Sequence, residues 1–544
     1  MCQAAARNTA SSSAVRFHLQ QRSKKKEGGV EVAMLLRIVV IIAGVISGCA
    51  YVTAATPQEF GGKGDVVTVH DGTIDGGSLS FRSASAVFTS KDVGKAIVVS
   101  GAGAGGNALV TKIQAFVAAK QVTLAASAST SVTEALTYYG SDDTSAIRSC
   151  IYQGIAASGS CTISDGVTFM VSNSKSTIAT FAAGHNPVSK FTLDGHGTII
   201  FAPQEPLTAG TNDRFFYISS QETNPMPISG PIDRGASSFT AQNVSDASLL
   251  SPGDWVVITE RDSAPMARDN VYADWAQVSE VMNAAVKTTT PFRTAFPNKR
   301  PWAGPPRYWG LGFRKVAPLT SNVTVRDITI IVPKVKDSHV AVAIATRDTR
   351  GTVISNVKCQ DASGNCFAGY MDQGLKFQNN EVNGALYPEF ASEVDADITG
   401  NRVNEVGTAL SLLTPATSGG LEIDFGTAFS NVTDNSMGPV RQVCILVSPG
   451  VHDTVVKGNI CDLVTFGSAA SCILSRGGYR MTVTQNTCKG ATGKSTAIDV
   501  GDANGLTVPM YSDSNRIFDN SVRGFSRASA CGGGRLRTDM CRER

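Results

Sequence analysis

One short pattern recurs along the chain between about Val323 and Ser526. In each copy an alternating apolar run is followed by Asn or Asp and then by a second short apolar run. Successive markers lie 21 to 34 residues apart, at Asp327, Asn356, Asn380, Asn401, Asn435, Asn459, Asn486 and Asn520. A repeat of this length, rich in β-branched residues and without helical spacing, predicts one coil of a parallel β-helix per copy.

A second pattern with the same period supports this interpretation. The segment 444–446 (Cys-Ile-Leu) recurs 28 residues later as 472–474, and Cys461 and Cys488 each stand two residues after a marker Asn. Stacked strands lie about 4.8 Å apart, so equivalent side chains form ladders and an Asn in each turn can hydrogen-bond to the Asn of the next coil. Two repeats in phase therefore predict an all-β solenoid.

Size and charge fit one elongated body. The 544 residues exceed the usual size of a single domain, but a solenoid grows in one dimension only. The formal net charge is +3, and basic residues are concentrated in residues 1–33 and 527–544, which leaves the remainder slightly acidic. A body without a basic stripe argues against nucleic acid as the partner.

An export signal is predicted over residues 34–55. Arg37 precedes an apolar stretch at 38–48 that is too short to span a bilayer and is typical of a secretory signal. Residues 1–33 then form a leader or reflect a misassigned start, with Met34 as the true start.

The end of this signal allows two interpretations. Residues 46–50 (Ile-Ser-Gly-Cys-Ala) resemble a bacterial lipobox in which Cys49 is lipidated, whereas cleavage after Ala54 or Ala55 would release a soluble chain. The first predicts an outer-membrane or periplasmic lipoprotein, whose lipid anchor is its only membrane contact. The second predicts a secreted protein.

The cysteines are compatible with disulfides in an exported protein. Eight of the twelve lie in the expected mature body, and Cys150 with Cys161 or Cys359 with Cys366 could close small loops. The stacked pairs 444/472 and 461/488 could equally be small apolar residues that fill a ladder. The sequence contains no CxxC pair or His cluster that would predict zinc.

The start of the body resembles a known family. Residues 59–65 (Glu-Phe-Gly-Gly-Lys-Gly-Asp) and, after an insertion, 140–147 (Gly-Ser-Asp-Asp-Thr-Ser-Ala-Ile) resemble the opening of the pectate-lyase superfamily, where a Phe-Gly-Ala-Lys-Gly-Asp strand precedes an Asp-Asp-Thr helix. The resemblance implies a right-handed parallel β-helix, which we place at residues 56–526. Ser141 or Asp142 is a suitable N-cap, and the apolar spacing after Ile147 predicts an amphipathic helix of about 14 residues that covers the first coil.

Two irregular stretches interrupt the repeat. Residues 66–138 and 225–318 contain strand-like runs joined by Gly-rich turns, and the second holds all four Trp. We therefore expect two β-rich insertions, regular coils over 321–526 and a disordered tail at 527–544.

The strand that faces a groove can be inferred from the resemblance, because the Asn ladder of that family follows the second strand of each coil. The first strand of each coil is then expected at 340–345, 367–370, 390–392, 408–412, 443–447, 472–474 and 497–500. Polar residues gather near the earlier coils, at Arg347, Asp348, Asp361, Tyr370, Asp372, Glu389 and Glu393.

These residues suggest two kinds of catalysis. Glycoside hydrolysis needs two carboxylates roughly 5 to 9.5 Å apart, which Asp361 or Asp372 with Glu389 or Glu393 could supply from adjacent coils. A lyase would instead need a base beside a uronate, with Arg347 or Ca²⁺ offsetting the charge that develops. The sequence otherwise specifies no cofactor.

A rim that binds substrate is predicted from aromatic and cationic residues. Tyr370 lies among the polar residues of the early coils, and Trp302, Arg307, Tyr308 and Trp309 lie in the second insertion. Rings stack on sugar CH groups and Arg reaches carboxylates. The alternative is that these rings only pack the insertion onto the coils.

The resemblance and these residues together predict an exported carbohydrate-active β-helix with a polysaccharide as its partner. We expect a polysaccharide lyase or glycoside hydrolase acting on an acidic polysaccharide. The alternative is a glycan-binding, adhesin-like β-helix of the cell envelope without catalytic activity, because one scaffold carries many activities.

Overall fold

A computed structural model of the protein describes residues 54–172, 179–180, 188–202, 214–262, 270–300, 302–304, 308–333, 342–360, 365–383, 388–404, 419–440, 443–463, 471–503, 510–512 and 514–532. The predicted leader, most of the export signal and Cys49 lie outside these residues. None of the helices in the described part of the chain is long and apolar enough to cross a membrane.

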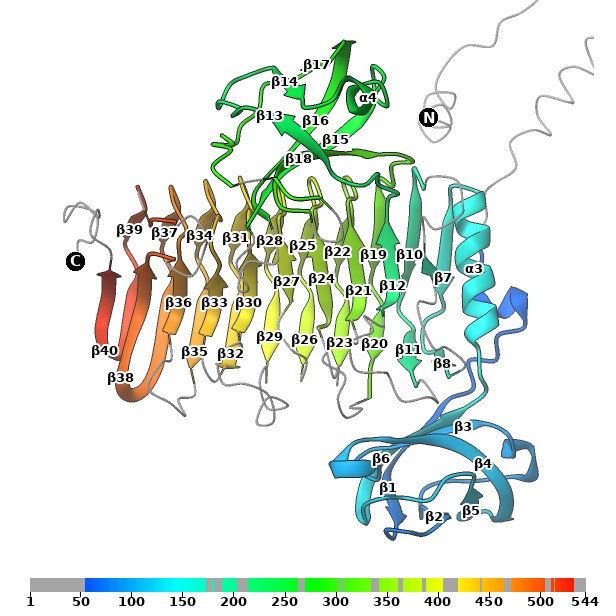
Figure 1. Ribbon diagram of the computed structural model, residues 1–544. Helices are drawn as coiled ribbons and strands as arrows, with labels where there is room; N and C mark the ends of the chain where they lie inside the picture. The colour runs from blue at the N-terminus through cyan, green and yellow to red at the C-terminus, as the bar shows by residue number, and fades with distance from the viewer. Residues whose placement is uncertain are drawn as a thin grey trace, which may run out of the picture. The chain divides into compact units, whose positions relative to one another are not determined.

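The body is a right-handed parallel β-helix, which confirms the predicted fold class. Its coils stack in Figure 1 from cyan through yellow to red. The first series of strands forms a ten-stranded parallel sheet. In chain order it contains β7 (Ser160–Ile163), β10 (Phe191–Gly195), β19 (Val323–Arg326), β22 (Val353–Ser355), β25 (Lys376–Gln378), β28 (Asp397–Thr399), β31 (Asn431–Thr433), β34 (Val455–Lys457), β37 (Thr482–Thr484) and β39 (Arg516–Phe518).

Two further series share the eighteen-stranded sheet. One contains β8 (Thr168–Val171), β11 (Thr198–Phe201), β20 (Thr329–Ile331), β23 (Lys358–Gln360), β26 (Glu381–Asn383), β29 (Arg402–Asn404), β32 (Ser436–Val440), β35 (Ile460–Leu463), β38 (Thr487–Gly501) and β40 (Ser521–Gly532). The other contains β9 (Ala179–Thr180), β12 (Arg214–Ser219), β21 (Val342–Arg347), β24 (Phe367–Tyr370), β27 (Glu389–Ala391), β30 (Gly419–Asp424), β33 (Val443–Val447) and β36 (Ser471–Arg476), and we call it the outer-face series.

The predicted strand at 408–412 lies outside the described residues, and β30 occupies the corresponding place in the outer-face series. β30 pairs with β27 on one side and with β33 on the other. The tail was expected to begin at 527, but β40 continues to Gly532 because it pairs with the long strand β38.

Inward-facing residues of every coil form one continuous apolar core, in which Phe, Val and Ile predominate. Helix α3 (Thr144–Ala156) closes the first coil, as predicted, by burying Ile147 and Ile151 in this core. Its N-cap is Asp143, whereas Ser141 or Asp142 was predicted, so the cap lies one residue after the second of these positions. The Asp143 carboxylate accepts hydrogen bonds from the backbone N–H groups of Lys63 at 2.7 Å and Gly64 at 3.2 Å, which ties the opening segment to the helix.

Each irregular stretch contains a closed six-stranded barrel. The first barrel contains β1 (Val67–Ile74), β2 (Ser80–Arg82), β3 (Ala96–Val99), β4 (Leu109–Ala118), β5 (Gln121–Leu124) and β6 (Val132–Gly140), with short 3-10 turns at η2 (Ser90–Asp92) and η3 (Ala104–Gly106); η1 (Pro57–Phe60) precedes it. The second barrel contains β13 (Met226–Ser229), β14 (Ser238–Ala241), α4 (Val244–Ala247), β15 (Trp255–Arg261), β16 (Asn270–Met282), β17 (Ala285–Thr288) and β18 (Gly310–Val316).

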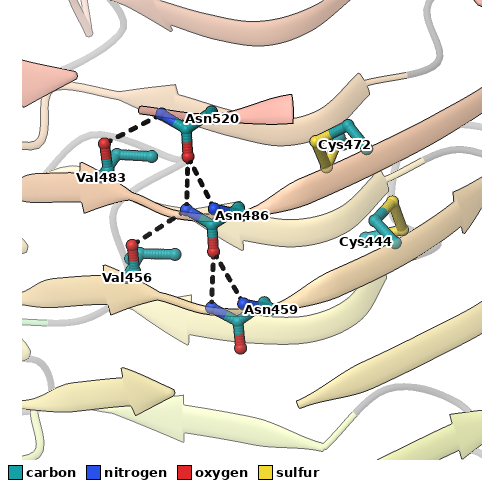
Figure 2. Close-up of a disulfide and its surroundings, with 9 residues drawn as sticks. Cys444, Val456, Asn459, Cys472, Val483, Asn486 and Asn520 are labelled. Carbon is teal, nitrogen blue, oxygen red and sulfur yellow. Dashed lines mark hydrogen bonds between the residues drawn. A yellow bond between two sulfur atoms is a disulfide. The ribbon is translucent and has the colours of Figure 1, made fainter. Parts of the chain in front are cut away.

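A buried asparagine ladder runs through the coils at Asn380, Asn401, Asn435, Asn459, Asn486 and Asn520. Figure 2 shows its last three members, in which the side-chain oxygens of Asn486 and Asn520 each accept from the side-chain amide and the backbone N–H of the preceding Asn. Asp327 and Asn356 do not belong to this ladder. They align with Asn379, one residue earlier in the turn, where all three residues have positive φ.

Four disulfides link elements of the coils and the capping helix. Two are Cys150–Cys161 and Cys359–Cys366, the pairs that the sequence suggested for small loops. The other two are Cys444–Cys461 and Cys472–Cys488. These bonds join two strands of one coil rather than the stacked cysteines of successive coils.

Candidate functional site

Strand alternation brings two glutamates together on the exposed side of the outer-face series. Phe390 and Ile423 point into the core, so their neighbours Glu389 and Glu422 point the opposite way. These two glutamates are register partners on the adjacent strands β27 and β30. Both are partly exposed. Their carboxylates therefore project from one face at neighbouring coils.

Two tyrosines extend this face over the preceding coils. Tyr217, Ala345 and Ala368 occupy the same ladder as the two glutamates, and Tyr370 lies in the next outward ladder. The Tyr370 hydroxyl donates to Glu389 Oε2 at 3.0 Å, and Asn365 Nδ2 donates to the same oxygen at 3.1 Å. The hydrogen bonds orient Glu389, and the rings give the face an apolar section.

Arg347 lies beside Tyr370 in that second ladder, within a network of charged groups. It donates to Glu222 Oε1 at 2.7 Å, and Arg314 forms an ion pair with the other oxygen of Glu222. Burial opposes ionisation of Glu222, but Arg314 and Arg347 hold its pKa below the usual range. Burial also opposes the charge of Arg347, whereas Asp348 and Glu222 raise its pKa. Arg347 is thus fixed as a cation by two acidic partners.

The structure places Asp372 and Glu393 inside the coils, which differs from the groove-facing position that the sequence suggested. Both are 0% exposed. Each follows a residue with positive φ, Met371 and Ser392, and this corner turns the next side chain inward. No polysaccharide can contact either carboxylate in this conformation.

These interior acids have strongly shifted pKa values. Burial raises the pKa of Asp372 to about 7, although hydrogen bonds from Thr346 and Thr349 favour its ionised form. Burial also raises the pKa of Glu393 well above its usual range, and the charge of Asp372 adds to this effect. The fully buried Asp348 has a raised pKa for the same reason, despite the nearby Arg314.

The aromatic rim falls in the second barrel, and its parts have different environments. Phe292 and Phe296, which stand on either side of Arg293 in the sequence, are buried in the barrel core. Trp302 and Tyr308 lie with their ring centroids 6.1 Å apart. The guanidinium of Arg261 lies 5.4 Å from the ring centroid of Trp309. The contacts shown for these rings lie within the barrel, whereas the alternative interpretation expected them to pack the insertion onto the coils.

Two predicted site residues, Asp361 and Arg307, lie outside the described residues. Glu422 and Asp424 are not among the predicted site residues, although segment 421–424 (Leu-Glu-Ile-Asp) alternates apolar and acidic residues, as a strand with one buried face does. The signal was missed because the strand of that coil was placed at 408–412. Within the described residues, no cluster of three or more His, Cys, Asp or Glu could hold a metal ion.

Comparisons with known proteins add little beyond the fold. No family model matches the chain, and no curated protein sequence does. Among solved structures, the tailspike protein gp49 from Pseudomonas phage LKA1 is 10% identical, with a TM-score of 0.41, and the match covers 72% of this chain and 71% of that one. The Gp54 tailspike of Acinetobacter baumannii bacteriophage AP22, in complex with capsular saccharide, is 12% identical with a TM-score of 0.35 and coverages of 72% and 67%.

The A-module of the Azotobacter vinelandii mannuronan C-5 epimerase AlgE4 is also similar, with 12% identity, a TM-score of 0.25 and coverages of 72% and 93%.

Proposed function

We propose that the protein is a glycoside hydrolase that cleaves an acidic polysaccharide on the outer-face strands. The observation that supports the proposal is the pair Glu389 and Glu422, presented by adjacent coils. Adjacent strands lie about 4.7–4.9 Å apart. Retaining glycosidases hold their two carboxyl groups about 5–5.5 Å apart. The spacing therefore favours a double displacement with retention of configuration.

The two glutamates would have different roles. Glu389 accepts hydrogen bonds from Tyr370 and Asn365, which stabilise its ionised form and suit a nucleophile. Glu422 would protonate the leaving oxygen and then activate water. Tyr217 and Tyr370 would stack against sugar rings on the preceding coils.

The environment of Arg347 favours hydrolysis over elimination. A lyase needs a cation that is free to offset the charge of the uronate as its proton leaves. Arg347 already pairs with Glu222 at 2.7 Å and with Asp348 at 3.3 Å. Arg347 is therefore better suited to holding the protein groups beside the acidic substrate in place than to neutralising an enolate.

We also propose that the protein is exported, with either a lipid anchor at Cys49 or cleavage near Ala54. Four disulfides within the described residues fit an oxidising compartment. Ala55 belongs to the first coil, where its N–H donates to Ser160 O at 3.0 Å and its carbonyl accepts from Thr162 N–H at 2.8 Å. Cleavage after Ala54 keeps both bonds, so we expect this junction if no lipid is attached. Mass spectrometry of the exported product tests both.

The activity test uses the purified chain with a panel of uronate-containing and neutral polysaccharides. We expect new reducing ends without unsaturated uronate products, and retained anomeric configuration by NMR. Glu389→Gln and Glu422→Gln should each lower kcat by about 10²–10⁴-fold with intact folding. Glu381→Gln is the matched control, because Glu381 is a partly exposed strand glutamate of another series, on β26.

The other outcomes are equally informative. Unsaturated products together with reducing ends would establish a lyase. Glycan binding without turnover on any substrate would establish the adhesin-like alternative. Full activity in both glutamine variants would overturn the proposed site.

A further inference from the structure

A groove separate from the outer-face glutamates lies on the coil turns that connect the outer-face series to the ten-stranded sheet. It has a volume of about 360 Å³ and is lined by Ser321, Asn322, Arg350, Gly351, Gln373, Gly374 and Asp395. Ser321, Arg350, Gln373 and Val394 form consecutive parallel bridges, so the groove crosses four stacked turns. A linear chain lying in it would pass one turn about every 4.8 Å.

Missing side chains create the hollow. Asn322, Gly351, Gly374, Asp395, Phe429, Asp453 and Arg480 follow the bridged residues and all have positive φ. At Gly351 and Gly374 no side chain projects from this row. A Cβ at Gly374 would meet only Gly351 N, at 4.0 Å. Because Asn322 holds the same conformation with a side chain, the two glycines are not required by the turn alone.

Arg350 is the exposed cation of this groove, and its charge is not neutralised. Its guanidinium lies 3.9 Å from the ring centroid of Trp255, and its Nε donates to Gln373 Oε1 at 2.9 Å. No ion pair to Arg350 is found among the described residues. Partial burial lowers its pKa, and no carboxylate raises it. The tryptophan and the amide hold the guanidinium in place for an external anion.

The acid in the groove does not compete for this role. Asp395 accepts two hydrogen bonds from Arg293, at 2.7 and 2.8 Å. Burial opposes the charge of Arg293, but Asp395 raises its pKa, as expected for a matched pair. The groove therefore contains one neutralised ion pair and one unsatisfied cation, with Ser, Asn and Gln side chains as partners for hydroxyl groups.

We propose that this groove is a second glycan-binding site, which takes a carboxylated sugar whose carboxylate pairs with the guanidinium of Arg350. An Arg fork matches a carboxylate with two parallel hydrogen bonds, and the polar lining suits the sugar hydroxyls. The second barrel contacts the corner between this groove and the outer face, through Trp275 Nε1 and Met371 O at 3.1 Å. The identity of the ligand as a sugar rests on the proposed function, whereas the carboxylate contact rests on Arg350.

The test measures binding of a galacturonic acid tetramer to the full chain by calorimetry, with a galactose tetramer as the uncharged probe. The Glu389→Gln, Glu422→Gln and Tyr217→Ala changes are present throughout in this parent protein, so that turnover is abolished and stacking on the outer face is weakened. We expect the uronate to bind and the neutral tetramer to bind at least tenfold more weakly. Arg350→Gln should lower uronate affinity at least tenfold, and Arg350→Lys should restore only part of it.

Two further variants separate charge from shape. Gly374→Asn should fill the groove and weaken binding at least fivefold without unfolding, because Asn322 shows that the turn accepts Asn. Arg516→Gln is the matched control, since Arg516 also lies over a ring, that of Phe518, at 5.5 Å but outside the groove. The Arg516→Gln protein should bind the uronate with unchanged affinity.

The outcomes separate this inference from the hydrolase proposal. Equal uronate binding by the parent, Arg350→Gln and Gly374→Asn proteins would overturn the groove while leaving hydrolysis intact. Loss of binding in both variants, with no turnover by the wild-type chain, would support the groove and reject the hydrolase. Absence of uronate binding to the parent protein would overturn the groove.

Discussion

Some acidic side chains of this protein face outward and others are buried, and the backbone conformation determines which. Glu389 lies within a strand and faces outward, whereas Glu393, four residues later, follows a left-handed corner and is fully buried. Asp372 and Glu393 occupy equivalent turn positions, each directly before a bridged residue, and they stack between Thr349 and Thr427. Both carboxyl groups are buried from solvent, and this burial raises the pKa of each.

Asp372 should make the protein less stable as the pH rises. Its folded pKa of about 7 lies above the reference value of 3.8, so the folded form retains a proton that the unfolded form releases. The contribution of Asp372 to the free energy of unfolding is fully present below about pH 4. It is lost between pH 4 and pH 7, by up to about 4 kcal/mol.

We expect Asp372→Asn to remove most of this pH dependence. Denaturant unfolding at pH 4.5 and pH 8 should give a smaller difference in the free energy of unfolding for the variant than for the wild type. The substitution also removes the charge that adds to the raised pKa of Glu393, which reduces the pH dependence in the same direction. Titrating groups away from Asp372 contribute equally to both proteins, so they cancel in the comparison. An unchanged difference would contradict the raised pKa of Asp372.

At the scale of elements, the asparagine ladder holds successive turns in register. Asn435 Oδ1 accepts from the backbone N–H of Asn401 at 2.9 Å and from its Nδ2 at 2.8 Å. Asn435 Nδ2 donates to Asn459 Oδ1 and to Ile398 O, each at 2.9 Å. One side chain thus satisfies buried groups of three coils, and its removal would leave several of them without partners.

Asn435→Ala should therefore destabilise the coils by about 3–5 kcal/mol, measured by denaturant unfolding. Asn356→Ala is the matched control, because its side chain is exposed and makes one hydrogen bond, to Asp327 at 3.0 Å. We expect a change below about 1 kcal/mol there. If both variants lost similar amounts of stability, burial of the ladder asparagines would not explain their contribution to the free energy of unfolding.

At the scale of the whole molecule, the second barrel contacts the coils backbone to backbone. A Cβ at Gly450 would lie 2.2 Å from Val271 O of β16, and a Cβ at Gly426 would lie 2.9 Å from Asn270 O. Trp275 and Val257 pack with Val394 of the coils in one apolar cluster. The same barrel provides Trp255, which lies against Arg350 of the groove.

Gly450→Ala should loosen the barrel without unfolding the coils. Limited proteolysis is expected to cut within residues 226–316 at least several times faster than in the wild type, while the coil fragments persist. Gly166→Ala controls for backbone strain, since Gly166 also has positive φ, +68°, but has no atom within 4 Å of an added Cβ. Equal proteolysis of the two variants would show that strain rather than barrel contact causes the effect.

Local patterns were sufficient to predict the coils and their cap. The period of the marker residues and the alternation of apolar side chains require only neighbouring residues, and they predicted the parallel β-helix and the helix that closes it. The same patterns could not assign every marker residue to its exact position in the turn. Asp327 and Asn356 lie in the same kind of turn as the ladder asparagines, but one residue before the buried position. Glu422 and Asp424 were missed because a long segment separates Asn401 from Asn435, and the sequence offers two places for the strand.

The sequence by itself determined the architecture, because a repeated alternation can bury its apolar face only by stacking coils. Tertiary structure alone decided which polar residues face solvent, since a single left-handed corner turns Asp372 inward while strand alternation turns Glu389 outward. It also decided which cations are neutralised. Arg293 and Arg350 look alike in the sequence, but the fold brings Asp395 to one and Trp255 to the other.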